Sequence, residues 1–373
     1  MASITKRGST YQYTVSRYVE GKPKHIRKGG FRTKKEAVEA AKEVEYLLAK
    51  GNEVKIQEIS FSDYFEKWVD LYKQGKHKNT LARYQNSVER VKEYFKDLPI
   101  QKINRNLYQE FLNQYGRGKS KETVRKLNTH IRSCVKDSIE DGYITVDFTR
   151  KAEFIATKSA KKAAEKHLNY MDSFRLYRTL KSKLDDSNTN TLYLILLALV
   201  SGMRYGELVG LTIDKFNFKN NTIKVERSFD YKEGIGKNGD GFDDLKNQQS
   251  ERIIAIDPSV MKEFHRLFED SPRHPQDLVF YRPSKVKVLS NEGANKVLKK
   301  LLTDLNIDSI TMHGLRHTHA SILLYKGLSI HSVSKRLGHA DIQTTLDHYA
   351  HVLKEMEKRD EKLAMDLFSK ASV

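Results

Sequence analysis

Apolar and polar residues alternate near the start of the chain, which is typical of short β-strands. Single polar residues separate Tyr11, Tyr13, Val15 and Arg17, and a second run, KHIRKGGF, follows Gly21. Together these runs predict a small three-stranded meander.

A helix is expected directly after this meander. Thr33 and Glu36 have the spacing of an N-terminal capping box, and Gly51 is a residue type that commonly ends helices. The apolar positions between them recur at helical spacing and would form one buried face: Ala37, Ala40, Ala41, Val44, Leu47 and Leu48. A sheet with one helix makes only a small core, so we interpret its basic face as a DNA-docking surface. The alternative, a soluble basic tail, does not account for the orderly strand and cap pattern.

Beyond a connector at residues 52–60, apolar residues recur at helical spacing up to about residue 140. Four separate stripes predict a bundle of about four helices. Their members are Phe61, Phe65, Trp68, Val69 and Tyr72; Leu81, Tyr84, Val88, Val91 and Phe95; Leu107, Phe111 and Leu112; and Val124, Leu127, Ile131, Val135 and Ile139.

A second linker is expected at residues 151–166, which are rich in lysine and alanine and carry no core stripe. After it, the run TLYLILLALVS at residues 191–201 predicts a buried helix, because it is too short to cross a bilayer. Strand-like residues 221–229 and 251–256 flank a polar, glycine-rich stretch and predict a hairpin region.

The charge balance favours a polyanionic partner. The chain has 67 Lys and Arg against 48 Asp and Glu, a net charge of +19, and binding to nucleic acid would release condensed counterions. An anionic membrane surface is the weaker alternative. With Cys134 as its single cysteine, the chain forms no internal disulfide, and its first residues lack the apolar stretch of a secretion signal. A cytoplasmic location in a bacterial or phage-infected cell is expected.

Basic side chains gather in two regions where DNA phosphates are expected to bind. The first thirty-five residues hold ten Lys and Arg but one acid, Glu20, and the polar faces of the bundle carry more, many near helix starts whose backbone N–H groups favour phosphate. A solvated charged face remains the alternative for each one. The DNA-binding candidates are Lys22, Lys24, Arg27, Lys28, Lys76, Lys78, Arg83, Lys119, Lys121 and Arg125.

The segment SGMRYGELVGL places Arg204 just after the buried helix. A guanidinium there needs an anion or a carboxylate to offset its desolvation. Glu207 lies three residues on, so a structural ion pair explains the two residues when they are taken alone.

A second candidate segment, TMHGLRHTH, predicts a helix capped by Thr311. His313 and Arg316 would share one face near the helix start, where they can grip a phosphate and exchange a proton with it. His317 and His319 are expected to point elsewhere. A metal site is disfavoured, because acidic and sulfur ligands are missing from this run.

The third segment, SKRLGHADIQTTLDHYAH, predicts a turn. Gly338 suits a helix C-terminus, His339 follows it, and Asp341 can cap a new helix that carries Tyr349. Lys246 lies on the polar connection before a strand, where a flexible ammonium can reach a leaving oxygen. Tyr349 alone would be interpreted as a packing residue and Lys246 alone as a surface lysine.

In combination these segments resemble the tyrosine recombinase family, especially phage and conjugative-transposon integrases. The shared pattern is an arginine in a G-x-R-x-x-E-L context, a hairpin lysine, H-x-x-R, L-G-H and a tyrosine about ten residues later. The resemblance implies a multidomain, mainly α fold with small β-sheets. It divides the chain into an arm-type DNA-binding domain (residues 1–54), a helical core-binding domain (58–150) and a mixed α/β catalytic domain (166–373). The matching positions are Arg204, Lys246, His313, Arg316, His339 and Tyr349.

The resemblance also implies a reaction without metal, ATP or another cofactor. Tyr349 would attack a DNA phosphate to give a 3′-phosphotyrosyl bond, and Lys246 would protonate the leaving 5′-oxygen. The two arginines would hold the phosphate with help from His339, while His313 would assist proton transfer at the tyrosine. Glu207 would orient Arg204.

By the same resemblance, a homotetramer would exchange strands between two double-stranded DNA sites through a Holliday junction. Core and arm attachment sites are the implied DNA partners, with accessory DNA-bending and directionality proteins and no membrane. The apolar stripe of Leu363, Ala364, Leu367 and Phe368 would dock on a neighbouring subunit or, equally well, on its own domain. Two alternative functions are a type IB topoisomerase-like swivelling of strands and a non-catalytic DNA-binding regulator.

Overall fold

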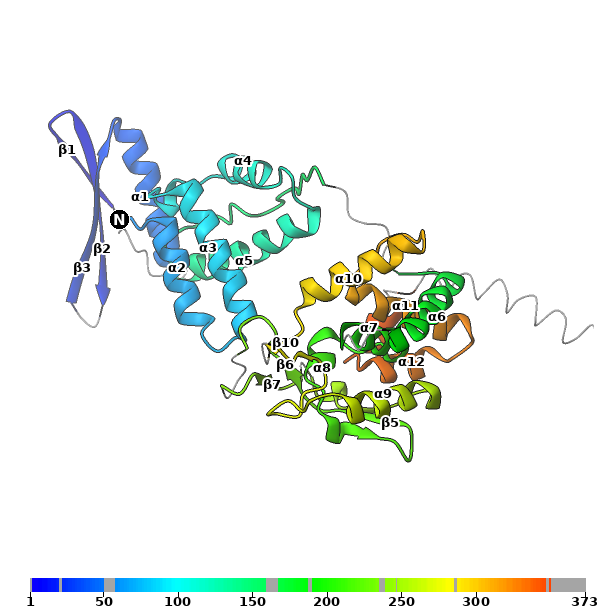
Figure 1. Ribbon diagram of the computed structural model, residues 1–373. Coiled ribbons are helices and arrows are strands. Elements are labelled where there is room, and N and C mark those ends of the chain that lie inside the picture. Colours follow the sequence, from blue (N-terminus) through cyan, green and yellow to red (C-terminus); the bar gives the residue numbers. More distant parts are fainter. Residues whose placement is uncertain are drawn as a thin grey trace, which may run out of the picture. The chain divides into compact units, whose positions relative to one another are not determined.

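The computed structural model describes residues 2–19, 22–49, 58–158, 167–186, 190–234, 239–245, 247–284, 287–346 and 349. The chain divides into two compact units, Met1–Ala160 and Lys161–Val373 (Figure 1). Gly51, Lys246 and the stripe from Leu363 to Phe368 lie outside the described residues, and so does the second half of the expected linker.

The first elements are the expected meander and helix. Strands β1 (Ser3–Arg7), β2 (Thr10–Val19) and β3 (Lys22–Phe31) form an antiparallel sheet in that order, and α1 (Lys34–Ala49) lies against it (Figure 1). Tyr13 and Val15 of β2 and Ile26 of β3 are buried together with Ala41 and Val44 of α1. The period-two pattern of the strands therefore meets the helical stripe in one small core.

The capping box of α1 forms only in part. The Glu36 N–H donates to Thr33 Oγ1 at 3.2 Å, as the spacing indicates. The Glu36 carboxylate, however, accepts from the backbone N–H of Arg32 at 3.1 Å, one residue before the capping threonine.

Four α-helices follow, as the stripes predict: α2 (Phe61–Tyr72), α3 (Lys78–Phe95), α4 (Arg105–Tyr115) and α5 (Lys121–Glu140). Ser60, Asn104 and Ser120 cap the starts of α2, α4 and α5 through their side-chain oxygens. One member of the stripes differs from expectation, since Tyr72 at the end of α2 is 56% exposed.

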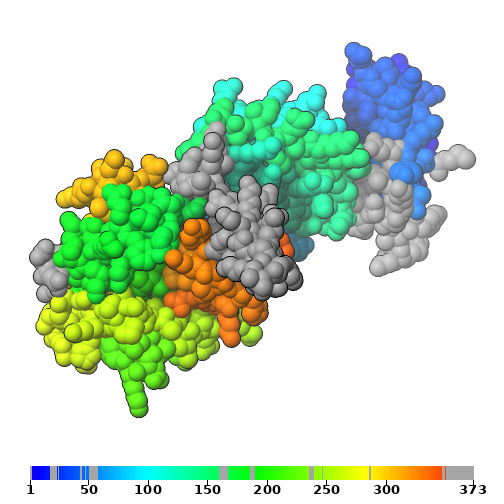
Figure 2. All heavy atoms as spheres, turned by 90° about the vertical axis from the view of Figure 1, so that its right-hand side faces the viewer, coloured from blue at the N-terminus to red at the C-terminus, as the bar shows by residue number. Residues whose placement is uncertain are grey.

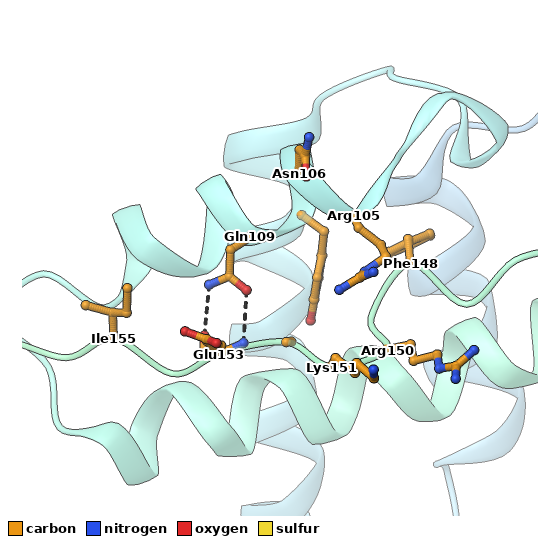
Figure 3. A pocket seen from close by; sticks show the side chains of 10 residues that line it. Arg105, Asn106, Gln109, Phe148, Arg150, Lys151, Glu153 and Ile155 are labelled. Carbon is orange, nitrogen blue, oxygen red and sulfur yellow. Dashed lines mark hydrogen bonds between the residues drawn. The ribbon is translucent and has the colours of Figure 1, made fainter.

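The first half of the expected linker lies against this bundle. The side-chain amide of Gln109 on α4 accepts from the Glu153 N–H and donates to the Glu153 carbonyl, both at 2.9 Å (Figure 3). Lys158 N–H donates to the Lys119 carbonyl at 3.1 Å, and Phe154 packs on the bundle core. Residues 152–158 are therefore held by hydrogen bonds of their backbone with the Gln109 side chain and with the Lys119 carbonyl, which the lysine and alanine composition does not reveal.

The second unit is built around a buried helix. Its helices are α6 (Tyr170–Asp186), α7 (Asn190–Ser201), α8 (Tyr205–Val209), α9 (Pro258–Asp270), α10 (Asn291–Asp304), α11 (Met312–Tyr325) and α12 (Ile330–Leu337). Residues 192–199 of α7 are all buried, as the apolar run predicts. Helices α6, α10 and α11 contact α7.

Small antiparallel sheets complete this unit. β4 (Phe216–Asn217), β5 (Thr222–Val225) and β8 (Arg252–Ala255) form one sheet in that order, which confirms the pairing of the two strand-like runs. Two further pairs are β6 (Ser228–Phe229) with β7 (Phe242–Asp243) and β9 (Tyr281–Arg282) with β10 (Lys287–Val288). Within the described part of the chain, every helix is too short or too polar to span a bilayer.

Candidate active site

Arg204 is placed by a turn that requires glycine. Gly202 ends α7 with a φ of +67°, and a Cβ there would lie 2.7 Å from the His319 ring and 2.8 Å from Leu337 Cδ2. An L side chain would meet both a left-handed backbone and an overlap. The turn lets Arg204 become the N-cap of α8.

Glu207 joins two arginines at the centre of the site. It accepts from the Arg204 backbone N–H at 2.9 Å, from Arg204 Nη1 at 2.7 Å and from Arg252 Nη2 at 2.8 Å. Burial alone would raise the pKa of Glu207, but the charges of Arg252, Arg204 and Arg316 outweigh burial and hold the pKa below its usual value. The carboxylate is therefore ionised, and the expected pair of Arg204 and Glu207 is part of a larger network.

Arg316 lies on α11, which Thr311 caps as expected through a 3.2 Å hydrogen bond from the Gly314 N–H. Its Nη1 donates to the Gly202 carbonyl at 2.7 Å. Its Nη2 is buried and has no hydrogen-bond partner among the described residues. Burial and the charge of Arg204 lower the pKa of Arg316 to about 9, so the guanidinium is still charged at neutral pH. A buried charged donor without a partner is costly, and an anion would satisfy it.

The turn after α12 closes the same site. Gly338 is left-handed, with a φ of +69°, and its carbonyl accepts from Arg204 Nη2 at 2.9 Å. His339 Nδ1 lies 2.7 Å from Thr345 Oγ1. Asp341 accepts from the Gln343 N–H at 3.0 Å, at the start of the helix over residues 342–346.

Tyr349 is buried, with 2% of its surface exposed, among Ala320, Leu324, Val333 and Leu337 of α11 and α12. Burial raises the pKa of its hydroxyl above the usual value, and the charge of Arg316 opposes this only in part. The phenol is therefore protonated at neutral pH.

His317 is the residue that sequence reasoning missed. Its Nδ1 lies 2.9 Å from the Tyr349 hydroxyl oxygen, so the expectation that it points away from the site was wrong. Because a helix turns once in about 3.6 residues, position 317 shares a face with position 313, and the helical wheel contained the signal. His313 itself is exposed, and its ring meets that of His317 edge to face at 4.8 Å between centroids.

His319 does point away from the site. Its Nδ1 lies 3.0 Å from the Leu199 carbonyl, and its Nε2 accepts from Arg336 Nε at 2.9 Å. Burial and Arg336 lower its pKa to about 3, so the ring is neutral. In the space-filling view, the orange region that contains α11 and α12 adjoins the green region that contains α6 (Figure 2).

The structure therefore brings together the side chains of Arg204, Glu207, Arg316, Tyr349 and His339. His313 lies in the first turn of α11, the helix that also carries Arg316. Lys246, the sixth expected residue, lies outside the described residues between Leu245 and Asn247. Among the described residues, His, Cys, Asp and Glu form no group of three or more arranged to hold a metal ion.

The DNA-binding candidates occupy two parts of the first unit. Lys22, Lys24, Arg27 and Lys28 lie on β3, where Arg27 and Lys28 are exposed, while the side chains of Lys22 and Lys24 fall outside the description. The others flank the starts of α3 and α5: Lys76, Lys78, Arg83, Lys119, Lys121 and Arg125. Arg125 pairs with Glu122 at 3.0 Å, so one candidate already has a local partner.

A basic cavity in the same unit was not expected. It has a volume of about 220 Å³ and lies between the start of α4 and residues 148–155 (Figure 3). Arg105, Arg150 and Lys151 bring three positive charges to its lining against one acid, Glu153. Lys151 belongs to the segment that the sequence predicts to be a linker, so the hydrophobic and polar pattern did not predict that it would lie beside Arg105 and Arg150.

Comparison with known proteins agrees with this architecture. Sequence models match in the order arm DNA-binding domain (residues 2–46), phage integrase SAM-like domain (60–155) and phage integrase family (166–356). A similar protein is the XerC-like tyrosine recombinase of Caldanaerobacter subterraneus subsp. tengcongensis, 25% identical over 96% of both chains.

Solved structures share the fold. The Tn1549 transposon integrase in complex with transposon right end DNA aligns with a TM-score of 0.65 at 18% identity, over 82% of this chain and all of that one. A lambda integrase tetramer bound to a Holliday junction aligns with a TM-score of 0.58 at 16% identity, over 91% of this chain and 95% of that one. Since the phage integrase model alone covers more than half of the 373 residues, this chain belongs to the phage integrase family and is a tyrosine recombinase.

Proposed function

We propose that Tyr349 is the nucleophile of this recombinase and that Arg204 and Arg316 hold the phosphate it attacks. The observation that carries the proposal is the buried Nη2 of Arg316, which has no partner among the described residues. It belongs to the same cluster as Arg204, and the charge of Arg316 opposes the effect of burial on the pKa of the Tyr349 hydroxyl. A nonbridging phosphate oxygen would supply the missing acceptor, and the bond would strengthen as charge builds in the transition state.

The carboxylate of Glu207 has a supporting role. Its bonds to Arg204 and Arg252 fix the angle of the Arg204 guanidinium, which also donates to Ser250 Oγ at 3.1 Å and to the Gly338 carbonyl at 2.9 Å. Such preorganised donors need little rearrangement when the phosphate arrives. His339, next to that carbonyl, would donate a further hydrogen bond to the phosphate.

Lys246 would serve as the acid that protonates the leaving 5′-oxygen, and His313 would assist proton transfer at the tyrosine. Tyr349 would then carry a 3′-phosphotyrosyl bond that conserves the energy of the broken ester. An incoming 5′-hydroxyl reverses the step on a new strand, without metal or ATP.

The chain would act as a homotetramer on two double-stranded DNA sites, by analogy with the lambda integrase tetramer on a Holliday junction. We assign arm-site binding to residues 1–54, core-site binding to 58–150 and catalysis to 166–373. The exposed Arg27 and Lys28 and the basic cavity beside α4 support phosphate contacts in the first two of these regions. Accessory DNA-bending and directionality proteins are further proposed partners of this chain.

Trapping the covalent intermediate tests the nucleophile. A suicide duplex, nicked beside the cleavage position of a candidate attachment site, should form an adduct with the wild type and none with Tyr349→Phe. The Phe variant keeps the ring in its apolar pocket, so its fold is retained. An adduct formed by Tyr349→Phe would refute the assignment.

A second variant separates chemistry from binding. Arg316→Ala should abolish the adduct while duplex binding stays within about threefold, because phosphate contacts elsewhere supply most of the affinity. Adduct formation with relaxation of supercoils, but without exchanged strands or junctions, would instead favour a type IB topoisomerase. Duplex binding with no adduct for the wild type would favour a non-catalytic regulator.

A further inference from the structure

The Tyr349 hydroxyl has a specific partner before any DNA is bound. His317 Nδ1 lies 2.9 Å from it, and the two ring centroids are 5.8 Å apart. The phenol has one proton to donate and is held protonated by its burial. A neutral imidazole with its proton on Nε2 accepts at Nδ1, which is the acceptor role that this geometry offers.

The two side chains are held by helices α11 and α12. His317 lies one turn after His313 on α11, directly beside Arg316, and is half-buried. The Tyr349 ring is enclosed by apolar side chains of α11 and α12. Groups held in this way need no search before proton transfer, which is what a general base requires.

We propose that His317 anchors the Tyr349 hydroxyl and receives its proton during cleavage. This inference rests on the proposed function of Tyr349. The proton passes from the phenol oxygen to His317 Nδ1 as that oxygen bonds to phosphorus. The bond from phosphorus to the 5′-oxygen breaks, and the leaving oxygen takes a different proton from its own acid, proposed above to be Lys246. Charge and protons balance without a further reactant.

The groups around His317 agree with this role. His313 meets its ring edge to face at 4.8 Å, so His313 can pass the proton on to solvent, since it is exposed. Arg316 directly precedes His317 in the sequence and is charged, which disfavours a second positive charge on the ring until the phosphate is present. The base is therefore ready to accept a proton only when the anionic substrate is bound.

The contact itself can be tested without DNA. A chain with 3-fluorotyrosine at position 349 should show a ¹⁹F shift that changes when His317 is replaced by Ala and changes little in His331→Ala. His331 is an exposed histidine on α12 of the same unit, so it controls for the loss of a histidine. An unchanged shift in His317→Ala would refute the anchoring half of the inference.

The role of His317 in cleavage can be tested by measuring single-turnover rates on the suicide duplex that traps the wild type. His317→Ala should cleave about 10²–10⁴-fold more slowly, with duplex binding unchanged. His317→Asn keeps an acceptor near the position of Nδ1 but takes up no proton, so it should stay at least about tenfold below the wild type. A rate for His317→Ala within about threefold of the wild type, or full activity in His317→Asn, would overturn the proton-acceptor role.

A sulfur leaving group shows at which end of the reaction His317 acts. A duplex with a bridging 5′-phosphorothiolate expels a thiolate, which needs no acid. This substrate should restore Lys246→Ala and leave His317→Ala slow; restored cleavage by His317→Ala would place the histidine at the leaving group and refute the inference. Failure of the proposed function has a different signature, because Tyr349→Phe would then still form the adduct.

Discussion

Gly202 and Gly338 show how single residues shape the candidate active site. Both have positive φ, and the carbonyl oxygen of each accepts a hydrogen bond from an arginine side chain. Gly202 accepts from Arg316, and Gly338 accepts from Arg204. In each case the absent side chain matters as much as the hydrogen bond. The glycines beside the expected arginine and histidine are therefore structural requirements of the site.

Gly202→Ala should destabilise the second unit strongly. The left-handed backbone costs about 1–2 kcal/mol, and overlap with His319 and Leu337 adds about 1–3 kcal/mol. Gly234→Ala is the matched control, because its φ is +73° but no atom lies within 4 Å of its Cβ position. Denaturant unfolding of both variants would separate backbone strain from overlap, and equal losses would contradict the overlap.

His319 makes the stability of this unit sensitive to acid. Its folded pKa of about 3 lies below the value of about 6.5 expected in the unfolded chain. Between these values the unfolded chain binds a proton that the folded chain does not. The stabilisation is thus complete above about pH 6.5 and falls by up to about 1.4 kcal/mol per pH unit below it.

His319→Gln removes this titration while keeping a donor and an acceptor for Leu199 and Arg336. Measured from about pH 7 to pH 5, the free energy of unfolding should fall less steeply in the variant than in the wild type. The slopes are compared because the variant is also expected to differ in stability at neutral pH. Identical slopes would show that His319 does not control this dependence.

The segment 152–158 packs closely against the C-terminal end of α4 in the helical bundle. Gly116 ends α4, and a Cβ there would lie 2.1 Å from the Ile155 carbonyl oxygen. Gly116 has an ordinary helical φ of −70°, so only contact with this segment requires glycine.

Gly116→Ala should displace this segment and cost about 1–3 kcal/mol. Hydrogen exchange of the Glu153 and Lys158 amides, which donate to Gln109 and to the Lys119 carbonyl, should become faster. Gly75→Ala, in open space within the same unit, should leave both amides protected. Unchanged exchange in Gly116→Ala would mean that the segment tolerates the methyl group.

For the whole molecule, the net charge of +19 governs how recombination responds to salt. Affinity for duplex DNA should fall steeply with salt, and each lost phosphate contact should reduce the slope of log K against log salt by about 0.9. If Arg27 and Lys28 both contact phosphate, the double alanine variant should lower the slope by about 1.8.

Fluorescence anisotropy with a labelled duplex at several salt concentrations measures this slope. Replacing Lys299 and Lys300 of α10, two exposed lysines of the second unit, changes the net charge equally and serves as the control. Equal slopes for the two double variants would show that net charge, and not the β3 face, sets the salt dependence.

The order and type of the elements could be predicted from the sequence for the first unit, and only in part for the second. Periodicity reveals which face of a helix or strand is buried, because burial follows the local repeat; the meander, the four-helix bundle, the buried α7 and the pairing of β5 with β8 were all predictable. It also indicated Arg204, Glu207, Arg316, His339 and Tyr349 through short motifs. Their roles remain predictions, and so does that of Lys246.

Which side chains meet could be learned only from the packing of the folded chain. The contact between His317 and Tyr349 joins α11 to a residue beyond α12, and the docking of residues 152–158 depends on the shape of α4. Among the described residues, the buried Arg316 Nη2 lacks a hydrogen-bond partner, and this becomes visible only once α11 packs against the turn at Gly202. Such contacts depend on distances between segments remote in the chain, and a local pattern of hydrophobic and polar residues carries no information about those distances.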